Sequence, residues 1–277
     1  MGLIYRINNL KAGLQLSGLL DIRLKKTAYK EAWIDGGAGL YAHMHRPVEK
    51  GGFPGVIIVP GANSPGTDYD RFDFLSAKDI ASAGYIVLHY DPSGRGKSPG
   101  KEDFWGPRHQ KELLGVIRHF SGLPDVEGVR ILSFSIGIII ATGALAMEDV
   151  EGVKFIFDWE GPSNRFNTTK NDTHEPLKDF PTSDDSFWNQ REAQRFIKDI
   201  RCGYFRYQAQ KDHVQGAYKG HAIELLNNAA KGRALWTRCN DNAPDIMYDA
   251  ENTDKYAWVP ERLNHKAMIL KYLLSLK

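Results

Sequence analysis

Ser135 stands between two apolar runs in the stretch Ile131–Ile140, where a serine can serve as a nucleophile or as a buried structural hydroxyl. A strand through all ten residues would exceed the usual length of about five or six, so the chain must break inside this stretch. The alanine-rich residues that follow favour a helix, which places the change from strand to helix at Ser135. A serine on such a turn exposes its hydroxyl above the carboxyl ends of the strands, where open α/β sheets bind ligands. The turn requires small neighbours, and Ser133 and Gly137 meet that requirement.

Two carboxylates flank a tryptophan in Asp158-Trp159-Glu160, directly after another apolar run. These side chains would lie on the rim of the expected site, and we assign all three to substrate binding as a working hypothesis. They could recognise a cationic group, bind a metal ion or pair with Arg165. An ordinary buried salt bridge is the simplest alternative.

The segments that must position these residues are runs of apolar residues in which apolar and polar side chains do not alternate. Helical stretches separate these runs. This pattern is typical of a parallel sheet buried on both faces. Before them, Ala28–Ile34 and Leu40–Arg46 are joined by Asp35-Gly36-Gly37, which suits a tight hairpin. The sequence therefore predicts an α/β fold with a doubly wound, mostly parallel sheet and an antiparallel N-terminal hairpin. The expected parallel strands are Gly55–Pro60, Tyr85–Tyr90, Val129–Phe134, Val153–Phe157 and Ala234–Thr237.

A chain of 277 residues suits a single domain, 1–277, with one elaboration. Residues 162–232 do not fit one strand–helix unit, so we predict a helical cap insertion there, with helices near Phe187–Ile200 and His221–Ala230. Its many aromatic side chains would roof the site, or else form a packing or dimer surface. His213 and His221 lie eight residues apart, which is not the spacing of metal ligands on a helix, and we assign them no role.

The stretch Ser133-Phe134-Ser135-Ile136-Gly137 resembles the nucleophile elbow G-x-S-x-G of the α/β-hydrolase superfamily, with serine replacing the first glycine. The segment 91–98, DPSGRGKS, looks like the D-x-R-G-x-G-x-S loop of that superfamily, and Gly61-Ala62-Asn63 stands where its oxyanion-hole loop is expected. The resemblance extends from residue 28 to the end of the chain. It is closest to serine esterases of the dienelactone-hydrolase and acyl-peptidase-like branch, without a propeller domain.

This resemblance implies a catalytic triad in the order serine, acid, histidine. Ser135 would be the nucleophile, and His265, before the terminal helix, would be the base. Asp241 looks like the acid, although Asp158 or Glu160 occupies a position that some members of the superfamily use instead. The implied oxyanion hole consists of the backbone N–H groups of Ile136 and of Ala62 or Asn63.

We therefore expect a cofactor-free serine hydrolase that cleaves a carboxylic ester, with a thioester, lactone or small amide as further substrate classes. No metal is expected. An acyltransferase or a carbon–carbon bond hydrolase would use the same triad. A non-catalytic ligand-binding homologue is the alternative from another functional class, and it would not react with a fluorophosphonate.

The net charge and the cysteine content indicate which partners and which cellular location to expect. A formal net charge of +2, from 36 basic and 34 acidic side chains, predicts no nucleic-acid partner. Two cysteines suit a reducing compartment, and Arg6 and Lys11 interrupt the apolar residues near the start, so a cytoplasmic location is expected. No stretch reaches the roughly 18 apolar residues of a membrane span. The expected partner is a small acyl substrate, and a homodimer is possible.

Overall fold

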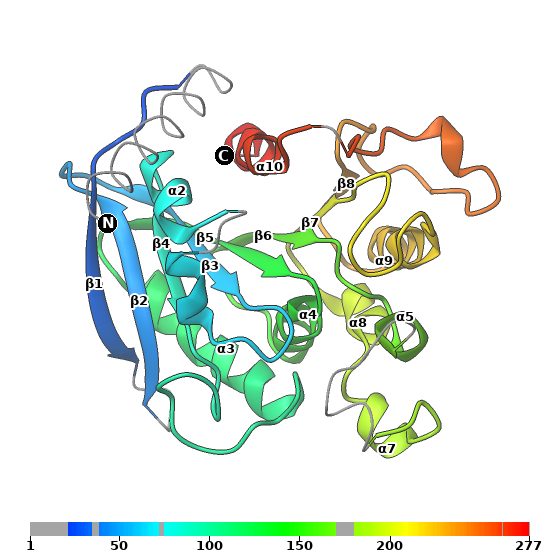
Figure 1. Cartoon of the computed structure of the whole chain (residues 1–277), viewed down its shortest axis with the longest axis horizontal. Coiled ribbons are helices and arrows are strands. Elements are labelled where there is room, and N and C mark those ends of the chain that lie inside the picture. The colour runs from blue at the N-terminus through cyan, green and yellow to red at the C-terminus, as the bar shows by residue number, and fades with distance from the viewer. Residues whose placement is uncertain (1–21, 35–38, 72–74, 170–179, 262, 277) are drawn as a thin grey trace, which may run out of the picture.

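Eight strands form one mixed sheet in the order β1-β2-β4-β3-β5-β6-β7-β8 (Figure 1). The computed structural model describes residues 22–34, 39–71, 75–169, 180–261 and 263–276. β1 pairs antiparallel with β2 and β2 with β4, and every other pair is parallel. The strands are β1 (Thr27–Ile34), β2 (Leu40–Pro47), β3 (Phe53–Val59), β4 (Ile86–Tyr90), β5 (Val126–Phe134), β6 (Val153–Trp159), β7 (Gly203–Tyr207) and β8 (Thr237–Cys239).

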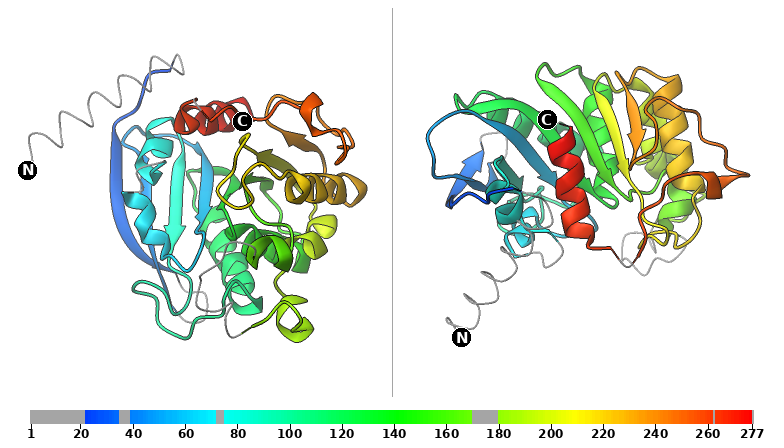
Figure 2. Two further views of the ribbon diagram at one scale, coloured as in Figure 1. Left: turned by 45° about the vertical axis from the view of Figure 1, so that its right-hand side comes forward. Right: turned by 90° about the horizontal axis from the view of Figure 1, so that it is seen from above.

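Helices cover both faces of this sheet, which explains why its central strands are continuously apolar (Figures 1 and 2). On one face, α2 (Ala77–Ser82) and α10 (His265–Ser275) pack on Val56 and Ile58 of β3. On the other face, Ile57 and Val59 belong to a second apolar cluster. Its helices are α3 (Pro107–Ser121), α4 (Gly137–Met147) and α9 (Gly220–Lys231). The predicted doubly wound sheet with an N-terminal hairpin is confirmed, and the expected hairpin turn at 35–37 lies outside the described residues.

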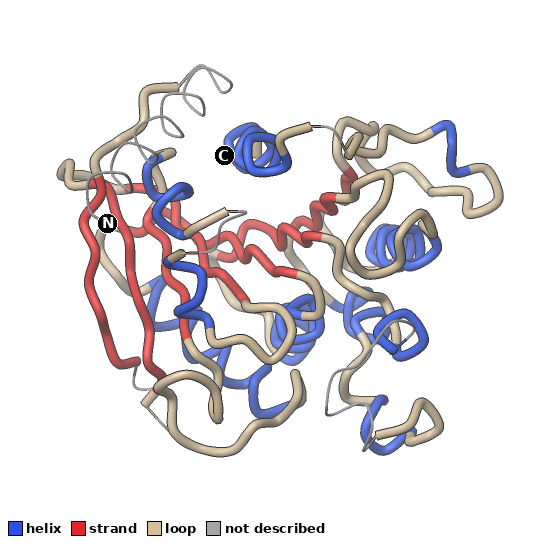
Figure 3. The backbone as a smooth tube through the Cα atoms, viewed as in Figure 1, coloured by secondary structure: helices blue, strands red, loops and turns tan. Residues whose placement is uncertain are grey.

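The prediction that 162–232 is only a helical cap is wrong, because β7 lies inside this segment and pairs with β6 and β8 (Figure 3). Three of the aromatic residues expected to roof the site, Tyr204, Phe205 and Tyr207, are instead buried in the sheet. α9 confirms the second predicted helix, whereas the first is broken into short turns. These are α7 (Asp185–Trp188), α8 (Ala193–Phe196) and η2 (Ile197–Asp199).

The last predicted strand was also misplaced. Ala234–Thr237 was expected to be a strand, but β8 begins at Thr237 and ends at Cys239. β8 is a short edge strand beside β7, so its sequence has few residues on which to show a period. The segment between β6 and β7 also contains α5 (Arg165–Thr169), and α8 of that segment packs against α4 and α9.

The parallel strands bring four loops to one edge of the sheet. β3, β5, β6 and β7 all point the same way, so the residues that follow their carboxyl ends meet there (Figure 1). These residues include Asn63 after β3, Ser135 after β5, Glu160 after β6 and His213 after β7. This edge is therefore where chemistry is to be sought.

Candidate active site

Ser135 occupies a sharp turn between the end of β5 and the start of α4. Its φ angle is +52°, a left-handed conformation that is rare for a residue with a side chain and is often maintained at functional sites. The Ser135 amide donates to the Trp159 carbonyl at 2.9 Å, which continues the ladder between β5 and β6 up to the turn. A Cβ on Gly137 would lie 2.8 Å from the Pro60 carbonyl oxygen, so the turn requires glycine at that position. The predicted change from strand to helix at Ser135 is therefore confirmed.

The loop after β3 lies directly against this turn. A Cβ added to Gly61 would come 2.7 Å from the Phe134 carbonyl oxygen and 3.2 Å from Cβ of Ser135. The Gly61 amide donates to the hydroxyl of Tyr69 at 3.3 Å, which ties the loop to the short helix η1 (Gly66–Asp70). The segment proposed to supply an oxyanion donor thus lies beside the serine side chain.

Two buried donors fix the orientation of the peptide between Ala62 and Asn63. The Ala62 carbonyl accepts from Nη1 of Arg95 at 2.9 Å and from Nε1 of Trp105 at 2.8 Å. Arg95 is itself held by two hydrogen bonds to the Glu102 carboxylate. In a planar trans peptide the N–H points opposite to the C=O, so the Asn63 N–H points away from Arg95 and Trp105. The loop containing Arg95 therefore braces the loop beside Ser135.

A carboxylate and an imidazole meet at the carboxyl edge next to the turn. Oε2 of Glu160 lies 2.7 Å from Nδ1 of His213, and Oε1 accepts from the Ala209 amide at 2.9 Å. The side chain of Glu160 is only 4% exposed, whereas that of His213 is 39% exposed. The His213 ring stacks on Trp159 at a centroid distance of 4.7 Å, and it is the Trp159 carbonyl that accepts from the Ser135 amide. A buried carboxylate thus orients a half-exposed imidazole that stacks on Trp159, the residue whose carbonyl accepts from the Ser135 amide.

The two remaining residues of the predicted triad each lie beside a different tyrosine. Asp241 is exposed, accepts from the Tyr272 hydroxyl at 2.9 Å and lies 3.8 Å from Nζ of Lys271. His265 is the first residue of α10, and its Nδ1 lies 2.5 Å from the Tyr207 hydroxyl. Burial raises the pKa of Tyr207 well above its ordinary value, so this phenol is neutral and adds no negative charge beside the imidazole.

Asp158 is not available to a substrate, contrary to the working hypothesis. Its Oδ2 lies 2.5 Å from Nη1 of Arg206, and neither side chain has any exposed surface. The Tyr204 hydroxyl donates to the same oxygen at 2.7 Å, and the Gly161 amide donates to Oδ1 at 2.9 Å. The salt-bridge alternative was correct for Asp158, but the partner is Arg206, while Arg165 pairs with Glu192.

Replacing Asp158 with alanine should lower the free energy of unfolding by about 3–5 kcal/mol, because Arg206 would remain buried without its counter-charge. Urea denaturation followed by circular dichroism measures this difference. Glu148→Ala is the matched control, since it removes an exposed ion pair with Arg118 and should change stability by about 1 kcal/mol or less. Equal midpoints for the two variants would show that the Asp158–Arg206 pair contributes nothing to folding.

Sequence reasoning missed His213 because it did not recognise β7. Once Gly203–Tyr207 is placed in the sheet, His213 follows a carboxyl end by six residues and becomes a candidate by position. Glu160 was considered as an acid, and its φ of +54° and its contact with His213 set it apart from Asp158. The arrangement of serine, imidazole, buried carboxylate and backbone N–H groups has the components of nucleophilic acyl transfer.

Comparison with solved structures identifies the fold. The chain is similar to the esterase Pf2001 of Pyrococcus furiosus, with 14% identity, coverage of 95% of this chain and 91% of the esterase, and a TM-score of 0.59. A protein assigned as a dienelactone hydrolase from Klebsiella pneumoniae is 15% identical, with 91% and 98% of the two chains covered and a TM-score of 0.58. An acylaminoacyl peptidase of Pyrococcus horikoshii is 15% identical over 80% of this chain and 38% of the peptidase, with a TM-score of 0.57.

No family model and no curated protein sequence matches the chain. The likeness is therefore one of chain arrangement at low identity. In the described part of the chain, none of the helices is long and apolar enough to cross a membrane.

Proposed function

The chain has the α/β-hydrolase fold, and we propose that it is a serine hydrolase of carboxylic esters with Ser135 as its nucleophile. The observation that carries this proposal is the left-handed Ser135 at the turn between β5 and α4, with the loop at Gly61 packed against it. A strained serine at the carboxyl edge of such a sheet has its hydroxyl presented to a ligand.

Glu160 and His213 are the proposed acid and base. The Nδ1–H of His213 donates to Glu160, which leaves the Nε2 lone pair to accept the proton of a serine hydroxyl. The buried carboxylate stabilises the imidazolium that forms. The pair implied by the resemblance, Asp241 and His265, is the alternative; there Asp241 accepts from the Tyr272 hydroxyl, and Nδ1 of His265 lies beside the Tyr207 hydroxyl.

The proposed reaction has two halves. Oγ of Ser135 attacks the ester carbonyl carbon while His213 takes the hydroxyl proton, and the resulting oxyanion accepts hydrogen bonds from the backbone N–H groups of Ile136 and Asn63. An amide at the start of α4 has no intrahelical acceptor, so the Ile136 N–H can serve this purpose. Collapse expels the alcohol, protonated by His213, and leaves an acyl-serine. Water, deprotonated by His213, then releases the acid and restores Ser135.

The substrate class follows from these groups. No charged side chain in the proposed machinery pairs with a substrate, since the carboxylate of Glu160 is buried and bonded to His213. Uncharged acyl esters therefore suit the site better than ionic ones. Trp159, which is partly exposed and stacked on His213, is the proposed apolar contact for the acyl group.

A fluorophosphonate should label the protein with one adduct per chain, because an activated serine oxygen displaces fluoride from phosphorus and forms a phosphonate ester that mimics the tetrahedral intermediate. Digestion and mass spectrometry should place the adduct on the peptide that contains Ser135. Hydrolysis of p-nitrophenyl esters of increasing acyl length then measures the substrate range. Folded protein that takes up no label and hydrolyses none of the esters would contradict the proposal and favour a ligand-binding role.

A further inference from the structure

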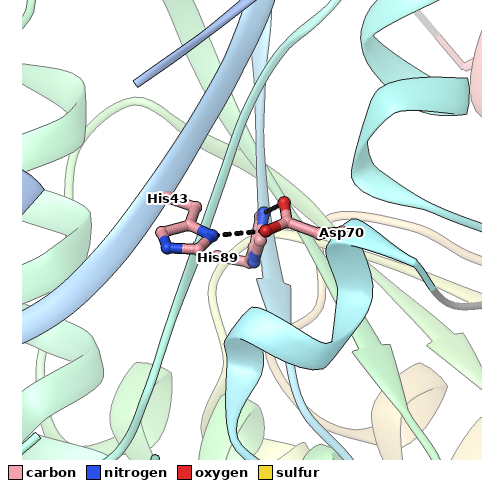
Figure 4. A group of neighbouring side chains, drawn as sticks. All are labelled: His43, Asp70 and His89. Carbon is pink, nitrogen blue, oxygen red and sulfur yellow. Dashed lines mark hydrogen bonds and ion pairs between the residues drawn. The ribbon is translucent and has the colours of Figure 1, made fainter. Parts of the chain in front are cut away.

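Three histidines surround one aspartate where β2 and β4 pair beneath η1. Nδ1 of His43 lies 2.5 Å from Oδ2 of Asp70. Nε2 of His45 lies 2.6 Å from Oδ1 of the same carboxylate, and Nε2 of His89 lies 3.1 Å from it. Figure 4 shows His43 and His89 approaching the Asp70 carboxylate from two different strands. None of these side chains belongs to the proposed catalytic machinery.

The pairing of β2 with β4 and the position of η1 bring these four side chains together. His43 and His89 are direct partners in the antiparallel register of β2 and β4, and His45, two residues farther along β2, lies on the same face. Asp70 is the last residue of η1. This short helix is pressed onto β4 at its start, where a Cβ on Gly66 would come 1.8 Å from the Tyr90 carbonyl oxygen. The position of η1 on β4 therefore places the Asp70 carboxylate beside the histidines.

His89 has an unsatisfied lone pair at the centre of the cluster. Its Nδ1 lies 2.9 Å from the Gly66 carbonyl, which can only accept, so Nδ1 carries the proton. In the neutral ring, Nε2 therefore has the lone pair. That nitrogen faces Asp70 at 3.1 Å, is fully buried and makes no hydrogen bond of normal geometry. A cation shared by this nitrogen and the carboxylate, either a proton or a metal ion, would satisfy both groups.

His43 can present a second ring nitrogen to Asp70. Nε2 of His43 lies 2.9 Å from the Tyr41 hydroxyl, which donates to Glu31, and 3.1 Å from the Tyr29 hydroxyl. In the absence of an ion, Nδ1 of His43 can donate to Asp70; when Nε2 carries the proton instead, Nδ1 offers a lone pair at the same position. Two ring nitrogens and one carboxylate oxygen thus converge at this point.

We propose that His43, His89 and Asp70 bind a divalent transition-metal ion, with zinc as the best fit. Imidazole nitrogens with a carboxylate are ligands that zinc prefers, and the other ring nitrogen of each histidine already has the oxygen partner that usually orients such ligands. The three donor atoms lie within 4.8 Å of one another. Bonds of about 2.0–2.2 Å in a tetrahedral site place ligand atoms about 3.3 Å apart, so small outward shifts of the rings suffice.

His45 completes the surroundings of the ion. Its Nε2 donates to Oδ1 of Asp70 and thereby orients the carboxylate, while water would occupy the fourth position. The Asp70 side chain is 22% exposed, which provides a path for entry. The bound ion would clamp η1 to β2 and β4, and η1 in turn holds the Gly61 amide through Tyr69. The site therefore stabilises the fold without taking part in the chemistry at Ser135.

Metal content and thermal stability test this inference, with protein that carries no histidine tag. After treatment with a chelator and dialysis, the protein should take up one equivalent of Zn²⁺ by mass spectrometry of the metal. Co²⁺ should give the visible absorption of a tetrahedral site. Because the ion binds only the folded state, saturating Zn²⁺ should raise Tm by about 5–10 °C. Absence of both uptake and a Tm shift in the wild-type protein would overturn the proposal.

Variants locate the site. Asp70→Asn and His43→Gln should weaken Zn²⁺ binding by at least about 100-fold, the upper range for loss of a mere orienting partner. His45→Gln should weaken it by about 10-fold. His119→Gln, at an exposed histidine on α3, is the matched control and should bind as the wild type does. Wild-type affinity in Asp70→Asn, with folding confirmed by circular dichroism, would place the ion elsewhere and refute the assignment. Ester hydrolysis is not a readout here, so the outcome is independent of the proposed function.

Discussion

Ser135→Ala should abolish ester hydrolysis, with kcat/KM falling by roughly 10⁵- to 10⁶-fold, as for removal of the nucleophile in other serine hydrolases. No other hydroxyl can replace the attacking oxygen, so water must attack the ester without an acyl-serine intermediate. The folded state should be unaffected, because alanine and serine meet the same cost at a φ of +52°. Initial rates with p-nitrophenyl acetate and a thermal melt measure both quantities.

Ser133→Ala is the matched control for that experiment. Ser133 precedes the nucleophile by two residues, is fully buried, and its Oγ makes no hydrogen bond within the described part of the chain. Its removal should leave kcat/KM within about threefold of the wild type and Tm unchanged or slightly raised. If Ser135→Ala retained more than one hundredth of the wild-type activity, Ser135 would not be the nucleophile.

His213→Gln should reduce kcat/KM by on the order of 10⁴-fold or more, whereas His265→Gln should reduce it by less than about 10-fold. The difference is expected because Nδ1 of His213 lies 2.7 Å from the buried carboxylate of Glu160, whereas Nδ1 of His265 lies 2.5 Å from the neutral phenol of Tyr207. The same assay on the two purified variants decides between the proposed base and the one implied by the sequence resemblance.

Substitutions of the two candidate acids, Glu160 and Asp241, test the triad in the same assay. Glu160→Gln keeps the shape of the side chain but removes the charge that stabilises the imidazolium, and it should cost about 10³- to 10⁴-fold in kcat. Asp241→Asn changes an exposed side chain bonded to Tyr272 and should cost little. If the ranking is reversed, so that Asp241 and His265 are the sensitive pair, the loop at Asp241 must rearrange when substrate binds.

The sheet was largely predictable because its strands are covered on both faces and are therefore continuously apolar. The hairpin and the strands that became β3, β4, β5 and β6 each show this pattern. β7 does not, because Arg206 interrupts a five-residue strand. That arginine is tolerated only through its pairing with Asp158 in the neighbouring strand, a contact 48 residues away that local sequence cannot indicate.

The candidate site was predictable where it depends on local turns and not where it depends on long-range contacts. The turn at Ser135 follows from strand length and from small neighbours, both of which are visible in a few residues. The contact between Glu160 and His213 joins two loops 53 residues apart. It could not be predicted because β7, the strand that places His213 at this edge, was not recognised. The histidine cluster was missed because it also depends on long-range contacts, between residues of β2, η1 and β4. The sequence led us to expect no metal.

The peptide between Ala62 and Asn63 also bears on selectivity. Arg95 and Trp105 set its direction as the chain folds, so nothing in this peptide must reorganise when an ester arrives. A rigid donor responds equally to the carbonyl of a short or a long acyl chain. Discrimination among acyl lengths must therefore arise from other side chains around Ser135, and changing them should retune chain-length preference while the hydrogen bond to the developing negative charge stays the same.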